Sequence, residues 1–131
     1  MSIQVEIVTP TAIAFSGTAT EVQAPGFLGE FGILPSHTQY LSVVKAGVVT
    51  IFADGKQTQF IVGRGFAEAG PDRLTLLTEL CEDAAGQDKA AAQTLLDEAE
   101  KTLASADPTS GEALTAARDA ELARARLSSS S

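Results

Sequence analysis

Hydrophobic and polar residues alternate in short runs over roughly the first 80 residues, which is the pattern of strands with one buried side. Ile3, Val5 and Ile7 share one face of the first run. Further runs occupy 14–16, 19–23, 41–46, 48–52, 57–62 and 74–80. Asp54 and Gly55 are typical of a type I′ hairpin turn, and residues 70–72 mark a second turn. We predict about eight to ten short strands in an antiparallel β-sandwich or flattened barrel.

Two helices are predicted in the second part of the chain, over 88–104 and about 110–127. Alanine and leucine recur every three or four residues, at Ala92, Leu96, Ala99 and Leu103 and then at Ala113, Ala116, Ala120, Ala123 and Leu127. Pro108 separates the helices, and Thr109 with Glu112 has the spacing of a capping box. The short connection predicts an antiparallel hairpin. Its alanine seams bury little apolar surface, so its position should depend on its surroundings.

Composition divides the chain at the same place. All eight valines, six isoleucines and seven aromatic residues lie at or before Phe66, whereas residues 84–131 contain 14 alanines. β-Branched and aromatic side chains favour strands, and alanine favours helices. We predict an α+β chain with a β-sandwich domain over 1–84 and a helical hairpin with a serine-rich tail over 85–131.

Charge and cysteine content limit the classes of partner. The 131 residues carry 9 basic and 17 acidic side chains, a net charge of −8, which opposes non-specific binding to nucleic acid or anionic lipid. Neutral or basic protein surfaces are the expected partners. Cys81 is the only cysteine, so a disulfide framework within the chain is excluded and a reducing compartment is favoured. No secretory leader or membrane-spanning run is predicted.

The most informative segment is 25–37, in which three glycines recur at intervals of three residues. It is not a phosphate-binding loop, because no Gly-Lys-Ser or Gly-Lys-Thr ending follows. One interpretation is a turn and bulge with Phe27, Leu28 and Phe31 in the core. The other is a loop that presents Phe27, Glu30 and Phe31 to a partner protein, since an apolar cluster with one acid is typical of a docking patch.

No catalytic constellation emerges from the remaining residues. His37 is the sole histidine and lacks the motifs of a hydrolase triad, so we expect it to be a hydrogen-bonded loop residue. Cys81 follows the last predicted strand without a cysteine partner and is expected to be an inert small hydrophobe. Four acids near the joint are expected to form a solvated junction in which Asp88 caps the first helix: Glu79, Glu82, Asp83 and Asp88.

Several segments, in order along the β part, resemble the epsilon subunit of the F-type ATP synthase. The central one is GEFGILPSH at 29–37, followed by Leu41 and by VKAG at 44–47. The others are VEIVTP at 5–10, FSG at 15–17 and GRGFA at 63–67. The family's arrangement, an N-terminal β-sandwich followed by a helical hairpin, is similar to the division that composition predicts.

The resemblance implies a non-catalytic rotor subunit without a cofactor, which binds the gamma subunit and touches the ring of membrane c subunits. It would be a peripheral protein on the cytoplasmic face of a bacterial inner membrane. Glu30 is the first choice for the c-ring contact, with Gly29, Phe31 and His37 nearby. A carboxylate beside glycines can pair with Arg or Lys and accept amide hydrogen bonds. Because one rim ion pair adds only about 0–1 kcal/mol, an apolar interface with gamma should supply most of the affinity.

Some members of that family bind ATP at the hairpin and use its helices as a brake on ATP hydrolysis. The nearest match to their pattern is LTAARD at 114–119, in which Thr115 replaces the acid. Arg118 and Arg124 are the residues that would bind nucleotide. The missing acid weighs against ATP binding, and a surface helix of alternating Arg and Ala, with Arg126, is the other interpretation.

Two hypotheses of different classes follow. The first is a coupling subunit of a proton-driven ATP synthase that fixes gamma to the c ring. The second is a free-standing β-sandwich interaction module with a helical tail. An enzyme is the least favoured class, since it needs a site that the sequence does not contain.

Overall fold

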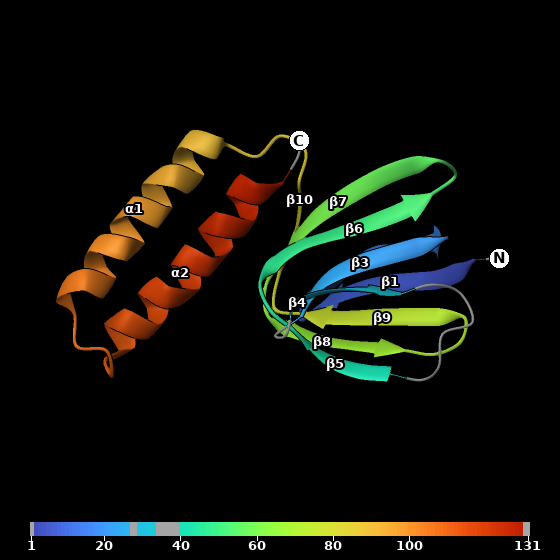
Figure 1. Ribbon diagram of the computed structural model, residues 1–131, viewed down its shortest axis with the longest axis horizontal. Helices are drawn as coiled ribbons and strands as arrows, with labels where there is room; N and C mark the ends of the chain where they lie inside the picture. The colour runs from blue at the N-terminus through green and yellow to red at the C-terminus, as the bar shows by residue number, and fades with distance from the viewer. Residues whose placement is uncertain (1, 27–28, 34–39, 130–131) are drawn as a thin grey trace.

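The computed structural model describes residues 2–26, 29–33 and 40–129, and consists of a β-sandwich followed by two antiparallel helices (Figure 1). The described strands are β1 (Ile3–Thr9), β2 (Ala12–Ala19), β3 (Glu21–Gly26), β4 (Gly29–Ile33), β5 (Tyr40–Val44), β6 (Gly47–Ala53), β7 (Lys56–Val62), β8 (Gly65–Ala69), β9 (Arg73–Thr78) and β10 (Cys81–Asp83). The helices are α1 (Lys89–Ser105) and α2 (Gly111–Ser128). The predicted fold class is confirmed.

The strands form one hydrogen-bonded path, β10-β7-β6-β3-β5-β8-β9-β1-β2, with β4 paired to β3. The path folds into two layers, the first with β10, β7, β6, β3 and β4 and the second with β5, β8, β9, β1 and β2. Among the described residues, β3 and β5 pair at Gly26↔Val44. The described strand pairs are antiparallel, as predicted, with one exception: β1 runs parallel to β9. A parallel pair needs a long connection, and here the whole intervening part of the sandwich supplies it.

The core lies between the two layers. Ile3, Val5 and Ile7 are fully buried, as their alternation predicts, together with Leu74 and Leu76 of β9. Across the core from them are side chains of the other layer: Val22, Ala24, Val49, Ile51 and Val62. Every residue in this main cluster belongs to the sandwich, so the sandwich has a core of its own.

The predicted hairpin turn between β6 and β7 is confirmed. Asp54 and Gly55 have φ of 54° and 73°, the left-handed values that a type I′ turn requires. The end of the sandwich differs from the prediction, because Cys81 does not follow the last strand. It begins β10, in which Cys81, Glu82 and Asp83 pair with Val62, Ile61 and Phe60 of β7.

The helix caps confirm one prediction and correct another. Asp88 caps α1, its carboxylate accepting a hydrogen bond from the Ala91 amide at 3.0 Å. The predicted capping box of Thr109 and Glu112 is wrong, because the N-cap of α2 is Ser110, whose Oγ accepts from the Ala113 amide at 3.1 Å. Thr109 is instead held by Asp107, whose Oδ1 accepts from the Thr109 amide and hydroxyl. These bonds hold the pKa of Asp107 below its usual value.

The hairpin lies at one end of the sandwich, with α2 between α1 and the strands (Figure 1). α2 contacts β6 and β7, where Ala125 and Leu122 cover the buried Ile61 together with Ala84. The two helices meet through the predicted alanine seams, in which Ala99, Ala116 and Ala120 are buried. The structure therefore places the hairpin against the sandwich, a position that the sequence left open.

Candidate functional site

An apolar row crosses the outer face of the second layer. Residues that are direct neighbours on five adjacent strands form it: Val43 of β5, Phe66 of β8, Leu77 of β9, Val8 of β1 and Ile13 of β2. Val8 is half-buried, whereas the other four are exposed, Phe66 at 54% and Ile13 at 61%. Single exposed apolar side chains are ordinary, but a continuous row of them marks an interaction surface.

A second row, which is mostly polar, runs beside the first, two residues away along β5, β8, β9 and β1 and three residues away along β2, where a bulge shifts the register. It contains Leu41 of β5, Glu68 of β8, Thr75 of β9, Glu6 of β1 and Ser16 of β2. Because strand side chains alternate between faces, both rows point away from the core. The outer face is therefore apolar along one row and mostly polar along the next, which carries the two carboxylates Glu68 and Glu6.

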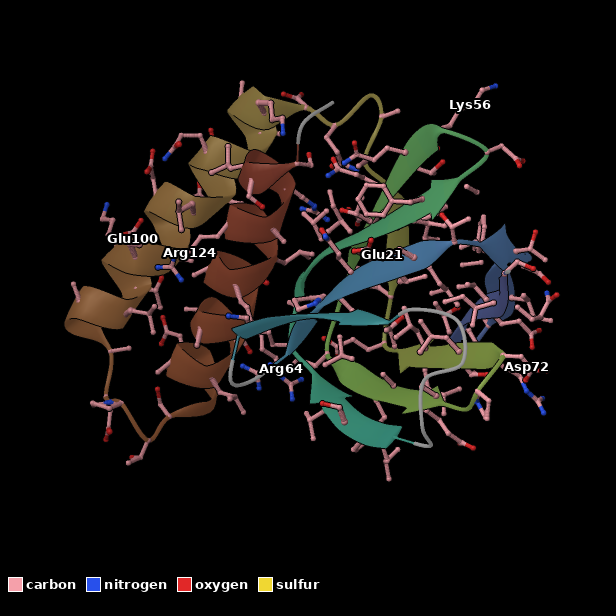
Figure 2. All side chains as sticks on the ribbon, turned by 45° about the vertical axis from the view of Figure 1, so that its right-hand side comes forward. Glu21, Lys56, Arg64, Asp72, Glu100 and Arg124 are labelled. Atoms are coloured by element: carbon pink, nitrogen blue, oxygen red, sulfur yellow. The ribbon has the colours of Figure 1, made fainter. Side chains whose placement is uncertain are left out.

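The contact between hairpin and sandwich contains two half-buried ion pairs. Glu121 of α2 accepts hydrogen bonds from Arg64 Nη2 at 2.7 Å and Nε at 3.1 Å, and from the Ala46 amide at 2.9 Å. Figure 2 shows Arg64 at the end of the sandwich that faces α2. Burial raises the pKa of Glu121, but the bonds from Arg64 and Ala46 and the charges of Arg64 and Lys45 outweigh it, so that its pKa lies below the usual value.

The second pair corrects the expectation of a solvated junction at Glu82, whereas Glu79, Asp83 and Asp88 are exposed as expected. Glu82 accepts from Arg126 Nη2 at 2.7 Å and Nε at 2.9 Å, a bidentate geometry, and both side chains are half-buried. The hydrogen bonds to Glu82 raise the pKa of Arg126 against the effect of burial. Lys89 of α1 holds the end of α2, donating to the carbonyl oxygens of Arg126 at 2.6 Å and Ser129 at 2.9 Å. Arg126 is thus not a free surface arginine.

Three of the residues predicted to meet the c ring, Gly29, Glu30 and Phe31, lie on β4. β4 pairs antiparallel with β3, in register from Gly26↔Gly29 to Val22↔Ile33. Phe27 and His37 lie outside the described residues. The turn expected in this segment also lies outside the described residues, and the c-ring contact stays a prediction.

The two arginines proposed for nucleotide lie on different sides of α2. Arg118 lines a small cleft of about 130 Å³ with Arg64, Asp119 and Glu121, between the hairpin and the sandwich. Arg124 is exposed, six residues further along α2, which rotates it by roughly 120° from Arg118 around the helix. The structure does not bring these two side chains together, and nucleotide binding stays a prediction.

Cys81 is the one remaining candidate residue. Cys81 packs against the core, where burial, with the charges of Glu82 and Asp83, raises the pKa of its thiol to about 11. Within the described residues, no group of three or more His, Cys, Asp or Glu side chains is placed to hold a metal ion. No helix in the described ranges is long and apolar enough to cross a membrane.

Sequence reasoning missed both the apolar row and the two ion pairs. The alternation of hydrophobic and polar residues along β1 and β9 did indicate which side of each strand is buried. It did not indicate which strands pair with each other. The partners in the ion pairs are 57 and 44 residues apart along the chain, a separation that no local pattern connects.

Comparison with known proteins agrees with this architecture. Residues 2–84 match the family described as the ATP synthase delta/epsilon chain, β-sandwich domain. An ATP synthase epsilon chain of Nitratidesulfovibrio vulgaris is 42% identical over 103 residues, covering 79% of this chain and 77% of the relative. One from Synechococcus sp. is 37% identical over 127 residues, covering 97% and 92%.

Solved structures show the same fold. A chain in the Euglena gracilis mitochondrial ATP synthase aligns with a TM-score of 0.85 at 17% identity, over 94% of this chain and 78% of that one. A chain in the Tetrahymena thermophila mitochondrial ATP synthase aligns with a TM-score of 0.63 at 13% identity, over 96% and 94%.

A β-sandwich that carries a row of exposed apolar side chains on one outer face is typical of a protein that binds other proteins. The chain belongs to the ATP synthase delta/epsilon family. It is an epsilon-type, non-catalytic subunit of the membrane-associated ATP synthase, the complex to which the first hypothesis assigned it.

Proposed function

We propose that the chain is a central-stalk rotor subunit that couples the c ring to the gamma subunit during proton-driven ATP synthesis. The outer face of the second layer binds gamma, and the β3–β4 hairpin with Glu30 meets the c ring. The assembly lies on the cytoplasmic face of a bacterial inner membrane. The solved assemblies that contain similar chains support this proposal, since their descriptions name a c ring and, in one, a central stalk.

The apolar row is the observation that carries the proposal. Its four exposed side chains each retain a large exposed surface. Covering each one would contribute on the order of 1 kcal/mol, because full burial of such a side chain is worth about 1.5–3 kcal/mol. The row spans five hydrogen-bonded strands, so the face is rigid and loses little conformational freedom on binding. Rigid attachment is what transmission of torque requires.

The two parts of the chain have different roles in this proposal. The β-sandwich domain over 1–84 has its own core and carries both subunit contacts. The hairpin over 85–131 is attached through half-buried ion pairs and a small apolar cluster. Such a limited contact suits a helical hairpin that regulates ATP hydrolysis, while assembly of the complex does not depend on the hairpin.

Binding of the full chain to its cognate gamma subunit tests the proposal. Phe66→Glu places a charge in the centre of the apolar row and should weaken binding at least tenfold, or about 1.4 kcal/mol, since the charge must be desolvated in the interface. Leu114→Glu is the matched control, because Leu114 is equally exposed at 56% but lies on α2. Isothermal titration calorimetry measures both, with circular dichroism to confirm folding.

Equal loss of affinity in the two variants, or none in either, would contradict a gamma site on this face.

For the c-ring contact, Glu30→Gln should leave gamma binding unchanged and reduce proton-coupled ATP synthesis in reconstituted vesicles. Unchanged synthesis would remove Glu30 from that contact.

A further inference from the structure

A groove lies beside the apolar row. It has a volume of about 610 Å³ and is lined by Leu41, Glu68, Arg73 and Thr75 together with the turn at 69–72. Figure 2 shows Asp72 of this turn at the end of the sandwich remote from the helices. The hairpin therefore does not cover the groove, which opens onto the same face as the apolar row.

The groove joins an apolar surface to a carboxylate. Leu41 is exposed at 72% and is the direct neighbour of Glu68 on the adjacent strand. Glu68 is in turn the neighbour of Thr75 and lies two residues from Phe66 on β8. An aliphatic stem can lie on Leu41 while a positively charged head reaches Glu68 and the Thr75 hydroxyl, which is how long basic side chains are usually accommodated.

The charges around the groove are mainly negative. Two acids, Glu68 and Asp72, line the groove together with one basic residue, Arg73. A further acid, Glu6, lies in the same row as Glu68, two strands away. Within the described residues, Glu6 and Glu68 belong to neither of the two ion pairs. Along its strand, Arg73 lies four residues from Leu77 of the apolar row, whereas Glu68 lies two residues from Phe66. The carboxylate of Glu68 is therefore the charge of the groove nearer to that row. The net charge of −8 also attracts a positively charged partner over longer distances.

We propose that this groove receives an arginine or lysine side chain of the subunit that covers the apolar row. The inference rests on the proposed function, in which that subunit is gamma. The two rows are two residues apart along β5, β8 and β9, the strands that line the groove. The basic side chain should therefore lie about 7 Å from the apolar side chains of the partner that cover the first row. The apolar row supplies most of the affinity, and the groove sets the orientation in which gamma binds.

Titration of the full chain with gamma at low and high salt tests the inference. Glu68→Gln should weaken binding roughly three- to tenfold at low salt and less at high salt, since the lost contact is a partly exposed ion pair. Glu68→Lys should weaken it further. Glu98→Gln on the exposed part of α1 is the matched control with the same change in net charge, and should leave affinity unchanged.

The outcomes separate this inference from the proposed function. If Phe66→Glu weakens binding and Glu68→Gln does not, the groove proposal is wrong while gamma still binds this face. If Arg73→Gln weakens binding and Glu68→Gln strengthens it, the groove receives an acidic group and the proposal is overturned. If neither Phe66→Glu nor Glu68→Gln changes affinity, the gamma site itself lies elsewhere.

Discussion

Single carboxylates decide how the two parts of this chain are joined. Glu121 bridges the connection before β6, through the Ala46 amide, and the connection before β8, through Arg64. Glu82 holds the last turn of α2 through Arg126. Both acids are half-buried, so their bonds contribute more than those of fully exposed pairs, whereas the 41% exposure of Arg64 reduces its share through solvent screening.

Glu121→Gln should reduce the free energy of unfolding by about 1–2 kcal/mol at neutral pH, because charge-assisted hydrogen bonds are replaced by neutral ones. The pKa of Glu121 is lowered in the folded chain. Its contribution is therefore complete above the unfolded value of 4.5 and is lost as the pH falls through the lower folded value. Urea titrations from about pH 8 to 3.5 should show a constant difference between variant and wild type that closes only below about pH 4.5. A difference that closes near neutrality would contradict this assignment.

At the scale of elements, the strands are held more strongly than the helices. The main cluster is formed by strand residues alone, while the helices meet through alanines. Gly65 shows how closely the strands pack, since a Cβ at this position would lie 1.8 Å from the Leu77 carbonyl oxygen. Alternation along the chain predicted the strand faces, and alanine spacing predicted both helices. The cap of α2 was missed because Ser110 and Thr109 are adjacent and both suit the position.

Deletion of residues 88–131 should leave the sandwich folded and able to bind gamma, because its core contains no helical side chain. The truncation uncovers Ile61, so the free energy of unfolding should fall by about 1–3 kcal/mol, within the range for exposing one large side chain. Amide NMR spectra of the truncated chain measure the fold, and co-purification with gamma measures assembly. A truncated chain that is unfolded would show that the hairpin is part of the structural core.

At the scale of the whole molecule, the chain has two distinct surfaces. The end near Arg64 binds its own hairpin, whereas the broad outer face of the second layer leaves an apolar row and an acidic groove open for partners. The division into domains at 84 and 85 stays a prediction. The helical hairpin is held to the sandwich by two ion pairs and a small apolar cluster, so its position is sensitive to the charges in those pairs.

Neutralising both hairpin carboxylates, with Glu82→Gln and Glu121→Gln together, should release the hairpin from the sandwich. Neutral hydrogen bonds then replace the charge-assisted ones in both pairs, and these bonds with the small apolar cluster around Ile61 are too weak to hold the helices. Small-angle X-ray scattering should then show a larger radius of gyration, with an unchanged far-ultraviolet circular dichroism spectrum. The control is Glu98→Gln with Glu100→Gln, which removes the same charge from exposed positions on α1. A compact double variant would show that apolar contact is sufficient.

The sequence by itself determined the classes of element, their order, the buried side of most strands and the resemblance to the epsilon subunit. These properties depend on residues close together in the chain, where side-chain alternation and helical spacing act directly. The tertiary structure alone decided the parallel pairing of β1 with β9, the partners of Glu121 and Glu82 and the assembly of the apolar row. Each of these brings together residues that are distant in sequence, and only the packing of the two layers around a common core determines which of them become neighbours.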